Sequence, residues 1–160
     1  MAGVGLGAYT MFFQLPDMDP GNIFGRAELR SNQDLDSGTY VAELSSDEIN
    51  HNGIEWNSND HFFTIITPGV YLICISITFR PDTATQSCVG FLKVNNDDQP
   101  LKSYIYIDRS YLGTAQASDI INLQAGDQLR LMGTIQGEGI FSGDTEGSLT
   151  FLSIRLVQKT

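Results

Sequence analysis

The longest apolar segment of the chain follows the turn signal Pro68-Gly69 and extends to Phe79. β-Branched and aromatic side chains dominate it, a composition typical of a strand. Because successive side chains of a strand point to opposite faces, one face is wholly apolar, while the other begins apolar and ends in hydroxyl groups. The first face holds Tyr71, Ile73, Ile75, Ile77 and Phe79, and the second holds Val70, Leu72, Cys74, Ser76 and Thr78.

A strand that is apolar on both faces is usually covered on both sides. A second sheet of the same chain can cover one face, but a chain of 160 residues with few helical segments has little left to cover the other. We therefore expect a neighbouring subunit to cover the second face. The expected subunit interface contains Val70, Leu72, Cys74 and Phe151.

The remainder of the chain consists of short apolar runs between polar turns, at intervals typical of an all-β domain. Strands are predicted at 23–29, 39–44, 54–56, 61–66, 69–79, 88–94, 101–107, 116–123, 128–135 and 148–157. The only helical element expected is a single turn at 45–49. About ten short strands in one domain predict a two-sheet antiparallel sandwich or jelly roll.

Residues 1–21 differ from the rest, since they combine alternating glycines, an aromatic patch and a closing Pro-Gly. We expect an arm that lies on a partner or on the domain, which occupies 22–160. The expected anchor is the patch of Tyr9, Met11, Phe12 and Phe13, because exposed aromatic side chains favour contacts. The start lacks the basic region of a secretory signal, and no run approaches the roughly 18 apolar residues of a membrane span. The sequence therefore predicts a soluble chain that is either not exported by that route or already processed.

Composition fits one globular domain, with 41% hydrophobic and 18% charged residues. The formal net charge of -10 repels phosphate backbones and anionic membrane surfaces. Neither nucleic acid nor a membrane is expected as a partner.

The sequence has few residues arranged as in catalytic or metal-binding sites. The chain has two histidines, His51 and His61, without the spacing of a zinc or nucleophilic site, and no acid/base pair has an evident role. The carboxylates around Asp34 and Asp36, and the segment 95–98, are expected to be solvated turns, with 95–98 a weaker alternative as a calcium loop. No enzyme activity, metal or cofactor is predicted. Cys74 and Cys88 are expected to be free thiols rather than a disulfide.

Three segments together resemble the C1q/tumour-necrosis-factor-like jelly-roll family. They are Pro68-Gly69-Val70-Tyr71 before an apolar strand, the stretch from Ser118 to Leu131 that contains Leu123-Gln124-Ala125-Gly126-Asp127-Gln128-Leu129-Arg130-Leu131, and the final strand Ser148-Leu149-Thr150-Phe151-Leu152-Ser153-Ile154. Their order and spacing match over roughly 22–158. In the second segment, Leu123 is expected to end a strand, Gly126 to take the turn, and Leu129 and Leu131 to enter the core.

The resemblance implies a ten-strand, two-sheet domain that assembles as a homotrimer, with the strands at 69–79 and 148–157 facing the threefold axis. Vertebrate members usually place an aromatic residue where this chain has Ile73, and often carry a collagen-like stalk that is absent here. Stand-alone bacterial or bacteriophage members are the more similar ones.

Two functions remain open. The favoured one is a structural or attachment module on the surface of a virus particle, with a bacteriophage capsid decoration or fibre as the leading case. The alternative is a secreted recognition protein that binds a glycan or a protein receptor. The expected partner-binding surface is a tyrosine row of Tyr104, Tyr106 and Tyr111, in which Tyr104 and Tyr106 face outward if Ile105 and Ile107 fill the core. The recognition protein has the apex loops as its other candidate surface, and the alternative for the tyrosines is that their rings simply cover an outer sheet.

Overall fold

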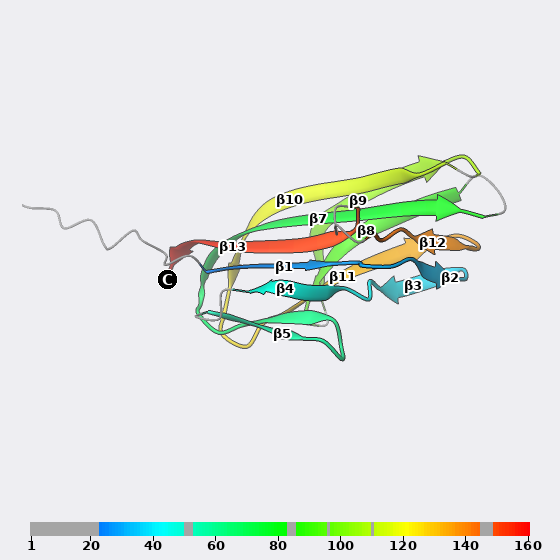
Figure 1. Cartoon of the computed structure of the whole chain (residues 1–160). Coiled ribbons are helices and arrows are strands. Elements are labelled where there is room, and N and C mark those ends of the chain that lie inside the picture. The colour runs from blue at the N-terminus through cyan, green and yellow to red at the C-terminus, as the bar shows by residue number, and fades with distance from the viewer. Residues whose placement is uncertain (1–22, 50–52, 83–85, 96, 110, 145–148) are drawn as a thin grey trace, which may run out of the picture.

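The computed structural model describes residues 23–49, 53–82, 86–95, 97–109, 111–144 and 149–160 (Figure 1). These residues form thirteen strands, and no helix among them has the length and hydrophobicity of a membrane span. The strands are β1 (Phe24–Glu28), β2 (Gln33–Leu35), β3 (Gly38–Val41), β4 (Ser45–Ile49), β5 (Ile54–Asn57), β6 (Phe62–Ile65), β7 (Gly69–Pro81), β8 (Gln86–Val94), β9 (Asp97–Ile107), β10 (Gly113–Leu123), β11 (Gln128–Ile135), β12 (Gly139–Phe141) and β13 (Phe151–Lys159). The predicted all-β sandwich of two antiparallel sheets is confirmed.

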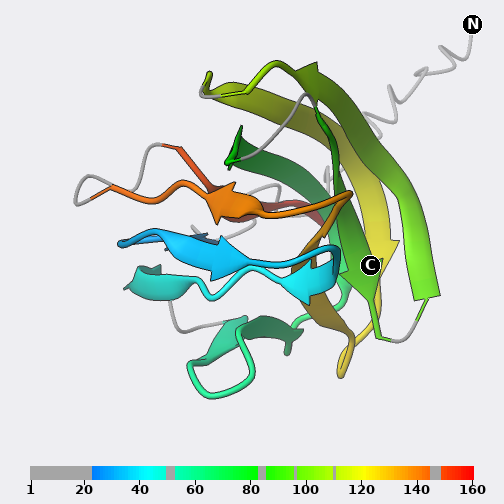
Figure 2. The ribbon, with the colours of Figure 1, turned by 90° about the vertical axis from the view of Figure 1, so that its right-hand side faces the viewer.

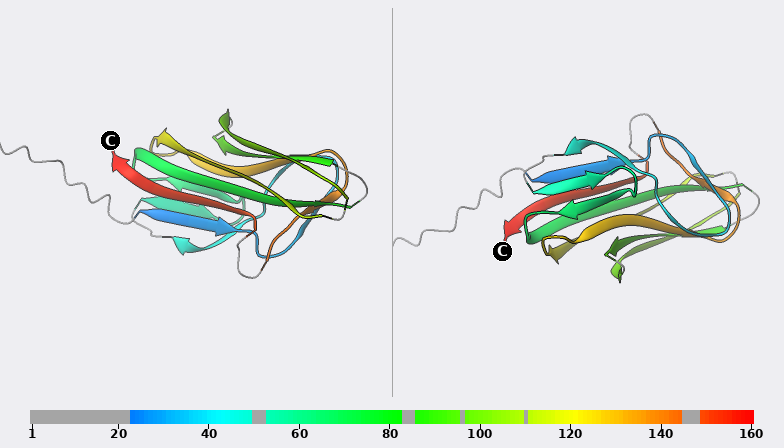
Figure 3. Two further views of the ribbon diagram at one scale, coloured as in Figure 1. Left: turned by 90° about the horizontal axis from the view of Figure 1, so that it is seen from above. Right: turned by 90° about the horizontal axis from the view of Figure 1, so that it is seen from below.

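The larger sheet is organised around β7. Along one side β7 pairs with β10 over its first eleven residues, and along the other it pairs first with β13 and then with β12. β1 and β4 continue the sheet beyond β13, and β2 continues it beyond β12. Figure 3 shows β13 lying beside β7 along most of its length. The two strands that the sequence placed in one sheet are therefore direct neighbours.

The smaller sheet has β11 at its centre, in the order β5-β6-β11-β8-β9. β8 pairs along one side of β11, while β6 pairs with its beginning and β3 with its end on the other side. This sheet lies against the larger one as the second layer of the sandwich (Figure 2).

The core lies between the two layers, and the first face of β7 supplies much of it. All five side chains predicted for that face are at most 2% exposed. Phe63 of the smaller sheet and Phe141 of β12 are fully buried in the same cluster. Burial of this apolar area is the main favourable term in folding.

The far end of the second face of β7 is covered by the chain itself. The hydroxyl groups of Ser76 and Thr78 donate to the carbonyl oxygen of Leu149, at 2.8 and 3.0 Å. The N–H of Thr78 donates to Thr150 Oγ1 at 3.0 Å. The expectation that a neighbouring subunit covers the whole second face needs correction here, because the segment before β13 already satisfies these buried polar groups.

Several elements differ from the sequence prediction. The helical turn expected at 45–49 is wrong, since these residues form β4 and pair with β1. β2 and β12 were not predicted, and they pair with each other within segments that the sequence left as connections. The expected arm at 1–21 lies outside the described residues.

The turn between β10 and β11 has the predicted form. Leu123 ends β10, Gly126 has a φ of 93°, and both Leu129 and Leu131 are fully buried. Such a positive φ favours glycine, which has no Cβ to clash with the backbone.

Gly90 on β8 and Gly133 on β11 lie directly opposite each other, and the space beside each one shows how tightly the two layers pack. A Cβ on Gly133 would overlap the Phe141 ring and lie 3.1 Å from Ile77, whereas a Cβ on its partner Gly90 would lie 3.4 Å from the nearest atom of Ile77. We expect Gly133→Ala to lower the free energy of unfolding by about 1 to 3 kcal/mol, the usual cost of overpacking a core. Chemical denaturation at a fixed protein concentration measures this loss.

Gly90→Ala is the matched control, since it adds the same methyl group to the opposite position of the same strand pair. It is expected to lose less stability than Gly133→Ala. Equal losses in the two variants would contradict the packing described here.

Candidate interaction surfaces

The outer face of the larger sheet, which points away from the core, carries an open apolar row. Ile120 on β10 lies directly opposite Leu72 on β7, Leu72 lies opposite Arg155 on β13, and Arg155 lies opposite Phe24 on β1. Directly opposite residues on neighbouring strands share a face and lie in contact range. We call Phe24, Leu72, Ile120 and the intervening Arg155 the open row.

The apolar members of the open row are unusually exposed for their size. Phe24 is 42% exposed, Leu72 is 38% exposed and Ile120 is 60% exposed. Val70 and Cys74 lie on either side of Leu72 along β7 and are half-buried. Exposed apolar side chains gathered on one face make this surface a candidate for an interaction.

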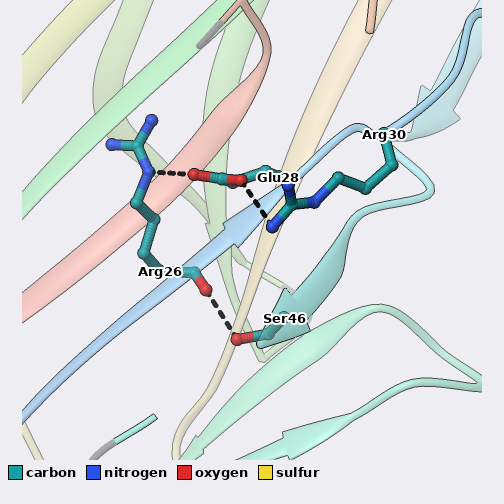
Figure 4. A network of polar contacts seen from close by, with 4 residues as sticks. All are labelled: Arg26, Glu28, Arg30 and Ser46. Carbon is teal, nitrogen blue, oxygen red and sulfur yellow. Dashed lines mark hydrogen bonds and ion pairs between the residues drawn. The ribbon is translucent and has the colours of Figure 1, made fainter. Parts of the chain in front are cut away.

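Toward β4 the same face is charged but internally compensated (Figure 4). Glu28 is 9% exposed and receives hydrogen bonds from Arg26 Nε and, at 3.0 Å, from Arg30 Nη2. Ser46 Oγ donates to the backbone carbonyl of Arg26 at 2.6 Å, which ties β4 to β1. The Arg26 guanidinium lies 3.9 Å from the centre of the Phe151 ring. One ring face of Phe151 is therefore already occupied by a cation of its own chain.

Tyr104 and Tyr106 of the tyrosine row lie on the outer face of the smaller sheet, while Tyr111 lies in the connection from β9 to β10. Tyr104 and Tyr106 are 74% and 75% exposed, while Ile107 is buried and Ile105 is half-buried. The predicted alternation of β9, with tyrosines outward and isoleucines inward, is therefore found. Tyr111 is also exposed and, with Tyr106, lines a hollow of about 390 Å³.

The two cysteines lie in different surroundings. Cys88 is fully buried in the core, and Cys74 is half-buried on the outer face of the larger sheet. Both are free, as predicted. Burial raises the pKa of the Cys88 thiol from 9.0 to about 12, and burial also raises the pKa of Tyr71 to about 12.

Other polar candidates are engaged in turns. His61 Nδ1 donates to the carbonyl of Leu44 at 2.8 Å. The Asn95 side chain donates to Asp127 at 2.9 Å and accepts from the N–H of Gln128 at 3.0 Å, so it joins two neighbouring turns. A hollow of about 320 Å³ is lined by Asp34, Asp36, Asp82 and Glu138. In the described part of the chain, no group of three or more histidines, cysteines or carboxylates is arranged to hold a metal ion.

Comparison of the folded chain with solved structures identifies the architecture. A structure of murine APRIL at pH 8.5 superposes with a TM-score of 0.61 at 16% sequence identity, over 87% of this chain and 99% of that one. A structure of Eiger TNF from S. frugiperda superposes with a TM-score of 0.65 at 14% identity, over 87% of this chain and 92% of that one. The chain has the tumour-necrosis-factor-like jelly-roll fold. No family model matches the sequence, and no curated protein matches it either.

Within this jelly roll, the structure collects the predicted interface residues on one outer face. Val70, Leu72 and Cys74 lie along β7, and Phe151 lies opposite Ser76 on β13. Sequence analysis missed Phe24 and Ile120, the two most exposed apolar members of the open row. The pair Ile120-Ile121 contained a signal, because two adjacent apolar residues of a strand cannot both face the core.

The buried thiol of Cys88 gives the jelly roll a dependence on alkaline pH. Between pH 9 and about pH 12 the unfolded chain loses this proton and the folded chain keeps it, so the free energy of unfolding falls as pH rises. We expect Cys88→Ala to reduce that fall by up to about 1.4 kcal/mol for each pH unit above pH 9. Tyr71, whose pKa is raised from 10.0, contributes equally to the parent and to the variant and so does not affect their difference. Denaturation curves recorded from pH 7 to pH 11 measure the slope.

Below pH 8 the parent and Cys88→Ala curves should run parallel, offset by whatever the lost sulfur contributes to packing. Parallel curves up to pH 11 would show that Cys88 titrates normally in the folded chain.

Proposed function

We propose that the chain is a non-enzymatic, homotrimeric binding module in which the outer face of the larger sheet forms the contact between subunits. The observation that carries this proposal is the open row, whose Phe24, Leu72 and Ile120 remain exposed in a single chain. Covering them with a second copy removes apolar area from water at about 25 cal/mol per Å². Val70 and Cys74 extend the same surface along β7.

The charged part of this face is compatible with burial between subunits. Glu28 is already bonded to two arginines, so bringing a neighbouring subunit close does not leave an isolated carboxylate. An unpaired buried charge would be strongly destabilising, whereas a compensated network costs far less.

We further propose that the trimer is a structural or attachment module on the surface of a virus particle, with a bacteriophage capsid decoration or fibre as the favoured case. A threefold-symmetric module suits a symmetric particle. The net charge of -10 disfavours nucleic acid as the partner, and the aromatic patch of Tyr9, Met11, Phe12 and Phe13 supplies an anchor to another particle protein.

The exposed tyrosines favour a second candidate, a secreted recognition protein for a receptor or a glycan. Tyr104, Tyr106 and Tyr111 present large amphipathic rings to solvent, and such rings are enriched at binding hot spots. Fold alone does not choose between the two roles.

Light scattering coupled to gel filtration tests the trimer. The parent chain is expected to have three times the mass of the 17.6 kDa chain at micromolar concentration. Ile120→Glu replaces the most exposed apolar side chain of the open row by a carboxylate and is expected to yield monomers, because apolar contact is lost and a charged group must leave water on assembly.

Ile66→Glu is the matched control, since Ile66 is an exposed isoleucine on another part of the surface, at 46% exposure. This variant should remain trimeric. A parent chain that is monomeric at this concentration, or an Ile66→Glu variant that dissociates as readily as Ile120→Glu, would argue against the open row as the interface.

Immunogold electron microscopy tests the location. Antibodies against residues 22–160 are expected to label the surface of virus particles purified from cultures that express the chain. Label restricted to free protein in the culture supernatant would contradict the virion role. Loss of receptor or glycan-array binding in Tyr104→Ala and Tyr106→Ala variants of unchanged mass would then favour the second candidate.

A further inference from the structure

A hollow of about 440 Å³ lies on the outer face of the smaller sheet, beside the hairpin of β5 and β6. Glu55 on β5 lies directly opposite Thr64 on β6, and Thr64 lies directly opposite Gln128 on β11. A carboxylate, a hydroxyl and an amide are thereby placed side by side on one face. The volume falls within the roughly 300–1,000 Å³ of small-molecule sites.

The rim of this hollow is held in place by its own hydrogen bonds. Asn57 Oδ1 accepts from the backbone N–H groups of Asn59 and Asp60, at 3.0 and 3.1 Å, and Asn57 Nδ2 donates to Asp60 Oδ2 at 3.0 Å. The Asn57 side chain is thus used to shape the loop, while Asn59 lines the hollow with an exposed side chain. A preformed rim reduces the conformational entropy lost when a ligand binds.

The wall opposite the rim orients the Gln128 amide. The Arg130 guanidinium lies 4.4 Å from the centre of the Phe62 ring, and Arg130 Nη2 donates to Gln128 Oε1 at 3.3 Å. With the amide oxygen engaged in this way, the Gln128 NH₂ group is the end left to donate to a ligand. Glu55 offers two acceptor oxygens at the other end of the row, and the Thr64 hydroxyl between them can donate or accept.

The lining excludes several ligand classes. An apolar ligand would displace water from these polar groups without replacing its hydrogen bonds, which is costly. An anion would meet the Glu55 carboxylate, and the only arginine beside the hollow in the described part of the chain is already stacked and bonded. A divalent cation would find a single carboxylate in the lining.

We propose that this hollow binds a neutral saccharide unit. Hydroxyl groups on different edges of a sugar ring donate to the Glu55 carboxylate and accept from the Gln128 amide, with Thr64 between them. The site lies within one protomer and shares no residue with the open row or the tyrosine row. It is therefore independent of both the trimer and the virion role.

Trp56 makes the proposal directly measurable, because it lines the hollow and is the single tryptophan of the chain. The probes are the methyl glycosides of glucose, galactose, mannose and N-acetylglucosamine, each titrated into the full chain while Trp56 fluorescence is followed. At least one is expected to give a saturable change. Glu55→Gln and Gln128→Ala are each expected to weaken that binding about tenfold or more, the effect of losing a hydrogen bond to a charged or buried polar group.

Glu138→Gln is the matched control, since it makes the same substitution in a separate hollow and should leave the affinity unchanged. The monomeric Ile120→Glu variant should bind as the parent does, which separates this site from the assembly. The proposal is overturned if none of the four glycosides changes Trp56 fluorescence saturably, if the Glu55 and Gln128 variants bind as tightly as the parent, or if calcium chloride or inorganic phosphate competes for the site. Unchanged circular dichroism of the variants ensures that a loss of binding is not a loss of fold.

Discussion

Complete burial of one face of β7 is the constraint on which the rest of the molecule depends. The five side chains from Tyr71 to Phe79 on that face are at most 2% exposed, and β7 pairs with three other strands of the larger sheet. Once these side chains are fixed in the core, alternation forces Val70, Leu72 and Cys74 to the outside. A slip of one residue would exchange the two faces, so the exposed apolar surface is a direct consequence of the core.

Different groups of the chain cover different parts of the outer face of the larger sheet. At one end, hydroxyl groups of Ser76 and Thr78 are closed off by the backbone before β13. Toward β4, Glu28 is paired with Arg26 and Arg30, and the Arg26 guanidinium covers Phe151. The apolar side chains of the open row lack such cover from the described part of their own chain. The proposed apolar contact with another copy is centred on this row, and the neighbouring polar groups of Ser76, Thr78 and Glu28 are compatible with it because their hydrogen bonds are already made.

Local pattern was sufficient wherever a single strand or turn decides the outcome. The two faces of β7, the outward tyrosines of β9 and the turn at Gly126 all follow from alternation or from glycine's freedom at positive φ. The local sequence pattern failed where pairing with a distant segment of the chain decides the structure. The segment 45–49 is short and mostly polar, so its local sequence does not favour a strand. It forms one because it pairs with β1. Ile120-Ile121 signalled one exposed isoleucine, but the assembly of the open row depends on the register of β1, β7, β10 and β13. The hollow likewise needs Gln128 on β11 to pair with Thr64 on β6, a register between strands distant in sequence.

Charge distribution bears on the proposed self-association through this face. Each chain carries a net charge of -10, so two copies that approach at random repel each other. The open row itself holds one charged side chain, the cation Arg155, and no carboxylate. In the proposed assembly, the contact through this row therefore adds no carboxylate to the repulsion between acidic chains. Apolar burial would supply the free energy of association in that assembly, while complementary charges would act on its orientation and rate rather than on its strength.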